Sequence, residues 1–345
     1  MKKSLIALAV LGASSVAFAA SNVTLYGVVD MSVVGSKANH VGDATVTMES
    51  GFRSGSRWGI KGVEDLGNGY NVGFVLESGF TADDGVSAQG GRLFGRESQV
   101  YVQGGFGKLG FGRFGSLASG AGSYHMLTGW ALGTSYTQGS WNNVFGTLRV
   151  NNAVAYMTPN FGGLTLGAMY SNSDAENDDS TNKWSKNNHY YGVGAKYANG
   201  PLTSSLIFEV QQQKAAADNK NAKYNVDFGF AYDLGSITPM FAYRYDWQDE
   251  GQKLNTFGLS AKAPVAGGTV MAGVRYYLGK DDGAAAGEED KLRSWTINAA
   301  YEYPLSKRTT VWGYGGYADG SKIWKDSSDK GINGWSVGVG MTHTF

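Results

Sequence analysis

The sequence contains no cysteine and only 5 prolines among its 345 residues. Without cysteine, the chain has no disulfide scaffold, no thiol nucleophile and no thiolate metal site. The scarcity of proline excludes collagen-like repeats and proline-rich linkers. Charged residues are also scarce, at 17%, and the formal net charge is +0. A chain without a basic field is not expected to bind nucleic acid.

Long hydrophobic runs are missing as well. Beyond the N-terminal segment, no stretch reaches the roughly 18 apolar residues that a membrane-spanning helix requires. The mean hydropathy of −0.25 does not exclude a membrane β-barrel, because only alternate residues of each strand face lipid. The chain is instead rich in glycine, with 52 residues, and in aromatic side chains, at 13%. Many aromatic residues with few charges argue against a disordered chain.

Residues 1–19 have the features of a secretory signal peptide. A basic start precedes a short apolar stretch, and Ala17-Phe18-Ala19 supplies the small residues of a cleavage site. We predict cleavage after Ala19 and a single domain over residues 20–345. An N-terminal membrane anchor is the alternative, but the apolar stretch is too short and lacks flanking charge.

Large apolar and small or polar residues alternate along most of the chain. From Tyr224 to Leu234, the even positions are large and apolar, whereas the odd positions are small, polar or charged. This period of two predicts β-strands with one apolar face. A soluble sandwich would alternate too, but Tyr and Trp at the ends of the apolar faces favour a membrane barrel with aromatic girdles and a wet interior. Similar alternation occurs in residues 164–170, 237–247, 270–278, 295–303 and 335–345.

Short and long connections alternate between the expected strands. Asp65–Gly69 is a short turn, whereas Gly35–Glu49, Thr81–Arg92 and Ser116–Leu148 are the first three long connections. The resulting strand count is sixteen. The sequence therefore predicts an all-β fold, a sixteen-stranded antiparallel transmembrane β-barrel. Its third connection is long enough to be expected to have a function of its own.

Several segments, taken in order, resemble Gram-negative trimeric porins. They are Asn22–Asp30, Ser56–Gly69, Leu93–Arg96, Phe106–Arg113, Arg149–Asn152, Tyr156–Pro159, Leu305–Thr309 and Met341–Phe345. The resemblance implies a homotrimeric channel in the outer membrane that passes small hydrophilic solutes and ions, with its third loop folded into the barrel. It also implies a barrel embedded in outer-membrane lipid and recognition of the terminal Phe345 by the outer-membrane assembly machinery. Acidic external loops such as Asp174–Asp179 could in addition share divalent ions with lipopolysaccharide.

Two departures from the family pattern bear on this resemblance. Thr342 stands where the family often has Arg. The stretch Phe114–Leu148 contains no Asp, Glu, Lys or Arg, so the acidic motif that the family often has in its third loop is missing. The third loop of this chain is therefore expected to be neutral.

A row of cations is expected on the inner wall. Arg53, Arg57 and Lys61 have odd numbers and would point to one face of a strand, whereas Phe52, Trp58 and Ile60 have even numbers and would point to the other. A cation on the lipid side at mid-bilayer costs about 2–4 kcal/mol, so the cations are expected to face the lumen and the apolar residues to face lipid or a neighbouring subunit. The resemblance places Arg57 and Lys61 at the pore constriction.

Further charged residues are candidates for the inner wall. Arg113 matches a constriction cation of the family, but it shares the odd numbering of Leu109 and Phe111, so it points inward only if the strand has a bulge or ends before it. The other cations expected in the lumen are Arg149, Arg244 and Arg275. The acidic candidates are Asp30, Glu77, Glu97, Asp227, Asp246 and Glu302.

A neutral third loop leaves the row of cations without an opposing charge from that loop. Arg and Lys on a pore wall attract anions, so we predict a mild anion preference. The alternative is that acidic external loops and wall carboxylates cancel this effect and leave a weakly selective pore.

The third loop also carries aromatic residues, namely Tyr124, Trp130, Tyr136, Trp141 and Phe145. They could form a stacking track for sugar rings, as in a substrate-specific channel, but anchoring of the loop on the barrel wall is the favoured interpretation. His125 could tune the pore with pH, although a hydrogen-bonded loop residue is the simpler interpretation.

Signatures of enzymes and of metal sites are weak. Gly105–Gly110 fits G-x-G-x-x-G, but it lies at a tight turn with no following helix. The 4 histidines lack metal-ligand spacing. We expect no catalytic residues, no metal and no cofactor. A structural or adhesive barrel is the remaining alternative to a channel.

Overall fold

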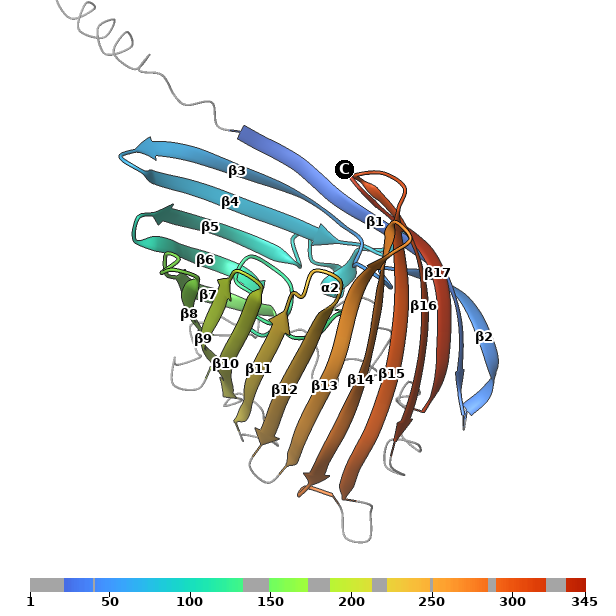
Figure 1. Cartoon of the computed structure of the whole chain (residues 1–345). Helices are drawn as coiled ribbons and strands as arrows, with labels where there is room; N and C mark the ends of the chain where they lie inside the picture. The colour runs from blue at the N-terminus through green and yellow to red at the C-terminus, as the bar shows by residue number, and fades with distance from the viewer. Residues whose placement is uncertain are drawn as a thin grey trace, which may run out of the picture.

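The fold is a single antiparallel sheet that closes on itself (Figure 1). The computed structural model describes residues 22–39, 41–132, 149–172, 187–212, 222–248, 251–284, 290–320 and 333–345. Between β4 and β5 lies α2 (Ala88–Gly91), a single short turn of helix. Within the described residues, no helix is long and apolar enough to cross a membrane.

The strands follow one another around the sheet in chain order. Their bounds are β1 Asn22–Ala38, β2 Val41–Ser50, β3 Arg57–Gly67, β4 Tyr70–Gly79, β5 Glu97–Gly104, β6 Gly107–Gly115, β7 Arg149–Met157, β8 Leu164–Ser171, β9 His189–Asn199, β10 Leu202–Gln212, β11 Lys223–Tyr232, β12 Thr238–Gln248, β13 Gln252–Val265, β14 Gly268–Asp281, β15 Lys291–Pro304, β16 Thr309–Gly320 and β17 Gly334–Thr344.

Pairing of β1 with β17 closes the sheet into a barrel, with registers from Val28↔Thr344 to Ala38↔Gly334. On its other edge, β1 pairs with β3 through residues 22–28 and with β2 through residues 31–38. Thus β2 and β3 are two halves of one strand, interrupted at residues 51–56. The 17 strands of the described ranges therefore fill 16 positions, and the predicted sixteen-stranded antiparallel barrel is confirmed.

The predicted alternation corresponds to the two faces of the barrel. In β11, Phe228 and Phe230 are each 37% exposed on the outside, whereas Asn225 and Asp227 are buried on the inside. Large apolar residues are exposed in the same way along most strands. An apolar surface of this extent on a closed barrel is suited to lipid.

The predicted first long loop, Gly35–Glu49, is wrong. Residues 35–38 and 41–46 continue β1 and β2 as a tight hairpin, paired from Gly35↔Val46 to Ala38↔Val41. The small and polar residues of this segment resemble a loop in composition. Their side chains nevertheless alternate with Val46 and Met48, which are exposed on the outer face.

The predicted lipid-facing position of Phe52 is also wrong. Phe52 is only 3% exposed, and inside the barrel its ring stacks on Trp312 at 5.6 Å between centroids. The chain leaves the sheet at Gly51, where φ is 74°, and rejoins it at Arg57. Alternation applies only within a continuous strand, so parity at residue 60 gives no information about residue 52.

Candidate functional site

The described part of the connection between β6 and β7 lies inside the barrel. This part, residues 116–132, is called here the third-loop segment. The backbone N–H of Ala118 donates to Glu209 Oε1 of β10 at 2.8 Å, and the N–H of Ala131 donates to Ser260 Oγ of β13 at 2.9 Å. Glu209 and Ser260 have the inward parity of their strands. The segment therefore follows the inner wall across several strands.

Two hydrophobic clusters fill the space between this segment and the wall. Leu117, Tyr124 and Met126 are fully buried against residues of β6 to β10. Leu132 packs near Phe52 and residues of β14 to β16. The interior of the barrel is thus packed on one side by the third-loop segment.

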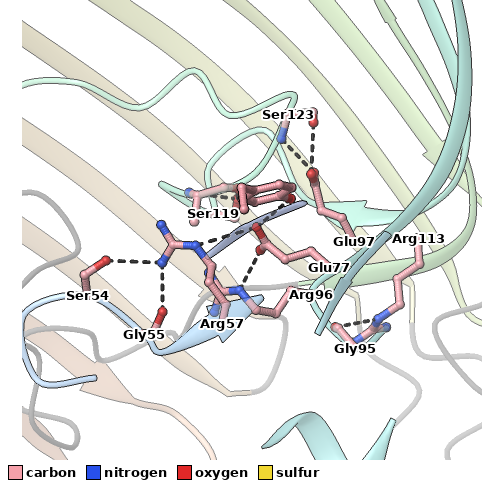
Figure 2. Close-up of polar contacts among 12 residues, drawn as sticks. Ser54, Gly55, Arg57, Glu77, Gly95, Arg96, Glu97, Arg113, Ser119 and Ser123 are labelled. Carbon is pink, nitrogen blue, oxygen red and sulfur yellow. Dashed lines mark hydrogen bonds and ion pairs between the residues drawn. The ribbon is translucent and has the colours of Figure 1, made fainter. Parts of the chain in front are cut away.

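Glu77 of β4 organises a polar cluster on the inner wall (Figure 2). Arg96 Nε donates to Glu77 Oε1 at 2.6 Å, Arg57 Nε lies 3.6 Å from Glu77 Oε2, and the Tyr26 hydroxyl donates to Oε2 at 3.0 Å. Arg57 is oriented from its other side by the carbonyl of Gly55, at 2.8 Å. Two guanidinium groups therefore share a single carboxylate.

Glu97 of β5 turns to the third-loop segment instead (Figure 2). Its two carboxylate oxygens accept the backbone N–H of Ser123, at 2.7 Å, and the Ser123 hydroxyl, at 3.0 Å. The Glu97 side chain is buried by this contact. Its charge therefore serves to hold the loop, and little of it faces the lumen.

Arg113 and Arg149 add positive charge beside this cluster. The β6–β7 register shifts between Gly112 and Phe114, which corresponds to the bulge, one of the two irregularities expected next to Arg113. Its guanidinium donates to the carbonyl of Gly95 at 2.9 Å and to Asn151 Oδ1. Arg149 lies close enough to Arg96 and Arg113 for the three positive charges to repel one another.

A second polar cluster lies on the facing wall. Arg244 of β12 lies 2.7 Å from Asp246 and 3.4 Å from Asp227 of β11. Both aspartates are buried. Glu209 of β10 is buried next to them and accepts the Tyr190 hydroxyl at 2.7 Å as well as the N–H of Ala118. Arg244 is thus balanced by carboxylates and is not an isolated pore cation.

Arg53 and Asp30 hold the interrupted strand. Arg53 lies in the 51–56 break and binds Glu302 of β15 through two parallel hydrogen bonds, at 2.8 and 2.7 Å. The fully buried Asp30 accepts the backbone N–H of Arg53 at 3.1 Å and the hydroxyl of Thr342. Of the predicted row of three cations, only Arg57 and Lys61 lie in β3.

Comparison with known proteins assigns this barrel to a family. A profile described as Gram-negative porin matches residues 4–322. The chain belongs to the Gram-negative porin family. Family membership places this porin in the outer membrane, where it forms a channel.

Individual relatives agree with the family match. An outer membrane porin protein of Bordetella pertussis is 30% identical over 404 aligned residues that cover 100% of both chains. Outer membrane porin protein 32 of Delftia acidovorans is 33% identical, over 99% of this chain and 95% of that protein. The solved structure of an anion-selective porin from Comamonas acidovorans has a TM-score of 0.71 at 29% identity, covering 94% of this chain and 100% of that one.

In the porin, two of the candidate cations keep contact with aromatic rings. Lys61 is exposed on the inner wall, with its Nζ 5.1 Å from the centre of the Tyr26 ring. The Arg275 guanidinium lies 4.0 Å from the ring centre of Trp130. Such cation–π contacts orient a cation without neutralising its charge.

The aromatic residues of the third-loop segment pack on the wall. Tyr124 is fully buried, and its hydroxyl donates to Gln99 Oε1 at 3.0 Å. Trp130 lies against Gly258 and Gly273. This geometry favours anchoring over a sugar track for these two residues. Three further aromatic candidates lie outside the described residues, namely Tyr136, Trp141 and Phe145.

His125, the histidine of the third-loop segment, is held by a hydrogen bond within that segment. The Nδ1 of His125 donates to the carbonyl of Gly122 at 2.8 Å, as in a hydrogen-bonded loop residue.

The described part of the chain contains no group of acidic and histidine side chains that could hold a metal ion. Phe345 extends β17, and its backbone exchanges two hydrogen bonds of 3.1 Å with Gly27. The predicted signal peptide, residues 1–19, lies outside the described residues.

Sequence reasoning missed Arg96, Glu209 and Lys108. Arg96 precedes β5 in irregular chain, where alternation gives no direction. Glu209 has the inward parity of β10, so parity alone could have found it. The Nζ of Lys108 lies 4.0 Å from the ring centre of Tyr101 on the neighbouring strand β5 and 5.0 Å from that of Tyr124. Only the folded third-loop segment brings Tyr124 to Lys108.

Proposed function

We propose that this porin is a water-filled channel for passive diffusion of small hydrophilic solutes and ions, with a preference for anions. One observation carries the preference: the inner-wall carboxylates described above are buried or ion-paired, whereas Lys61 keeps exposed surface on the same wall. Five of these carboxylates are at most 6% exposed, namely Asp30, Glu97, Glu209, Asp227 and Asp246.

The balance of charge around Glu77 supports the same direction. Four guanidinium groups lie near two carboxylates, and one of those carboxylates, Glu97, is bound to the third-loop segment. In water, an uncompensated unit charge at 4 Å from an ion contributes about 1 kcal/mol. A bias of this size gives a mild preference rather than exclusion of cations. The anion-selective porin from Comamonas acidovorans has a similar fold at 29% identity.

Reversal potentials in planar bilayers under a KCl gradient test this proposal. We expect the sign that corresponds to chloride permeating faster than potassium. Lys61→Gln should lower the permeability ratio of chloride to potassium, because it removes an exposed inner cation. Lys307→Gln, in the turn between β15 and β16, is the control and should leave the ratio unchanged. A reversal potential that reports faster potassium overturns the anion preference.

We also propose how the protein is exported and assembled. Three copies would associate in the outer membrane in contact with lipopolysaccharide, the assembly machinery would recognise Phe345, and residues 1–19 would be removed on export. The apolar outer face of the barrel suits both lipid and a neighbouring subunit. Native-gel mobility before and after heating tests the trimer. Mass spectrometry of the mature protein tests cleavage, with Ala20 expected as the first residue.

A further inference from the structure

The third-loop segment rests on glycines of the inner wall. For each of these glycines, a side chain would meet an atom of the segment. They are Gly110 of β6, Gly167 of β8, Gly194 of β9, Gly229 of β11, Gly258 of β13 and Gly273 of β14. All six have the inward parity of their strands, and together they form what we call the glycine seat.

A side chain at Gly229 would collide with backbone of the third-loop segment, which cannot move aside as a side chain can. A Cβ atom built there would lie 2.2 Å from the carbonyl oxygen of Thr128, which is backbone. The segment itself has a glycine at the same place, since a Cβ at Gly129 would lie 2.2 Å from the carbonyl oxygen of Phe241. Gly129 has a φ of 89°, a conformation suited to glycine. Loop backbone and wall backbone therefore touch without side chains between them.

The contacts under Trp130 are of a different kind. A Cβ at Gly273 would lie 2.6 Å from the Trp130 ring, and one at Gly258 would lie 3.2 Å from it. The ring lies on the wall at these two glycines, with the guanidinium of Arg275 4.0 Å from its centre. Here the seat accommodates a side chain of the loop.

Polar contacts fix the segment along the seat. Its backbone N–H groups at Ala118, Ser123 and Ala131 are bound by side chains of β10, β5 and β13. Because the segment is held at these points, a side chain added beneath it cannot be relieved by sliding along the wall. The free direction is away from the wall, into the lumen.

We propose that the glycine seat sets how close the third loop lies to the wall and thereby sets the width of the pore. Gly229 is the principal positioning residue. This inference rests on the proposed function as a diffusion channel, and it adds that pore width is determined from the wall beneath the loop as well as by side chains that face the lumen.

The experiment measures single-channel conductance and the size limit for uncharged sugars in liposome swelling. Gly229→Ala should lower both, and Gly229→Val should lower them further. Gly313→Ala is the matched control, because Gly313 lies on the outer face of β16 with no atom within 4 Å of an added Cβ. Heat-modifiable gel mobility verifies that each variant is a folded barrel.

A second pair of variants distinguishes the seat from a general defect. Gly258→Val should reduce conductance, and Trp130→Ala in the same chain should restore it, because the ring that the valine displaces is then gone. This pair also tests the inference if Gly229→Val does not fold. Folded Gly229→Ala and Gly258→Val barrels with the conductance and size limit of the unmodified porin would overturn the inference. An unmodified porin that does not conduct would instead contradict the proposed function.

Discussion

At the scale of single residues, closure of the barrel between β1 and β17, called here the seam, depends on Gly27. Its backbone pairs with that of Phe345, and a Cβ at this position would lie 2.2 Å from the Phe345 ring. Gly27 is therefore required by its neighbour and not by an unusual backbone angle. The aromatic ring at the end of β17 covers the place where a side chain of β1 would otherwise lie.

Substitution of Gly27 should accordingly weaken closure of the barrel. In Gly27→Val, the valine side chain and the Phe345 ring compete for one space, so a smaller fraction of protein should refold to the heat-modifiable form in detergent. Gly35→Val is the control on the same strand, since an added Cβ there meets its first atom only at 3.6 Å. Equal folded fractions for the two variants would contradict this account of the seam.

At the scale of elements, the third loop is held by carboxylates of the wall. Glu209 Oε1 accepts both the N–H of Ala118 and the hydroxyl of Tyr190. Removal of this acceptor leaves two buried donors without it, and each unsatisfied donor costs about 1–3 kcal/mol. The tether is thus strong enough to affect how often the loop leaves the wall.

We expect Glu209→Ala to give noisier channels than the unmodified porin, with more frequent brief closures in single-channel recordings. Glu209→Gln retains an oxygen acceptor with the same shape, so its traces should be nearly as quiet as those of the unmodified porin. If the two variants show the same noise, the hydrogen bonds of Glu209 do not hold the loop in place.

At the scale of the whole molecule, the main feature is that negative and positive side chains of the inner wall differ in exposure. The formal net charge is zero, yet the carboxylates of the two polar clusters on the inner wall are buried or ion-paired, whereas Lys61 is exposed on that wall. Selectivity therefore arises from the arrangement of charges and not from an excess of one sign. A preference of this origin must respond to screening.

The anion preference should fall as salt rises. The Debye length is about 10 Å at 0.1 M salt and about 3 Å at 1 M, so exposed inner cations act over a shorter range at high salt. We expect the permeability ratio of chloride to potassium to approach that of the free ions between these concentrations. Uptake of an uncharged sugar is the control and should not change. A ratio independent of salt would indicate selection by size.

Much of the fold could be predicted from the sequence. Alternation in β11 and β12 is local, because Phe228 and Asp227 differ in direction wherever the strand lies. The alternation fails where the chain leaves the sheet, and for that reason Phe52 was misplaced and Arg53 was assigned to one strand with Arg57 and Lys61. For the same reason, parity could have found Glu209 but could not have found Arg96, which precedes its strand.

By itself, the sequence determined the barrel, its strand number, its apolar outer face and the neutral third loop, because these depend on the order and polarity of neighbouring residues. Only the tertiary structure decided which charges remain exposed and where the third loop lies. Arg53 and Glu302 are 249 residues apart, and Asp30 and Thr342 are 312 apart; closure of the sheet brings both pairs together. Whether a charged side chain is buried, ion-paired or exposed depends on that closure, so the pattern of neighbouring residues cannot predict it.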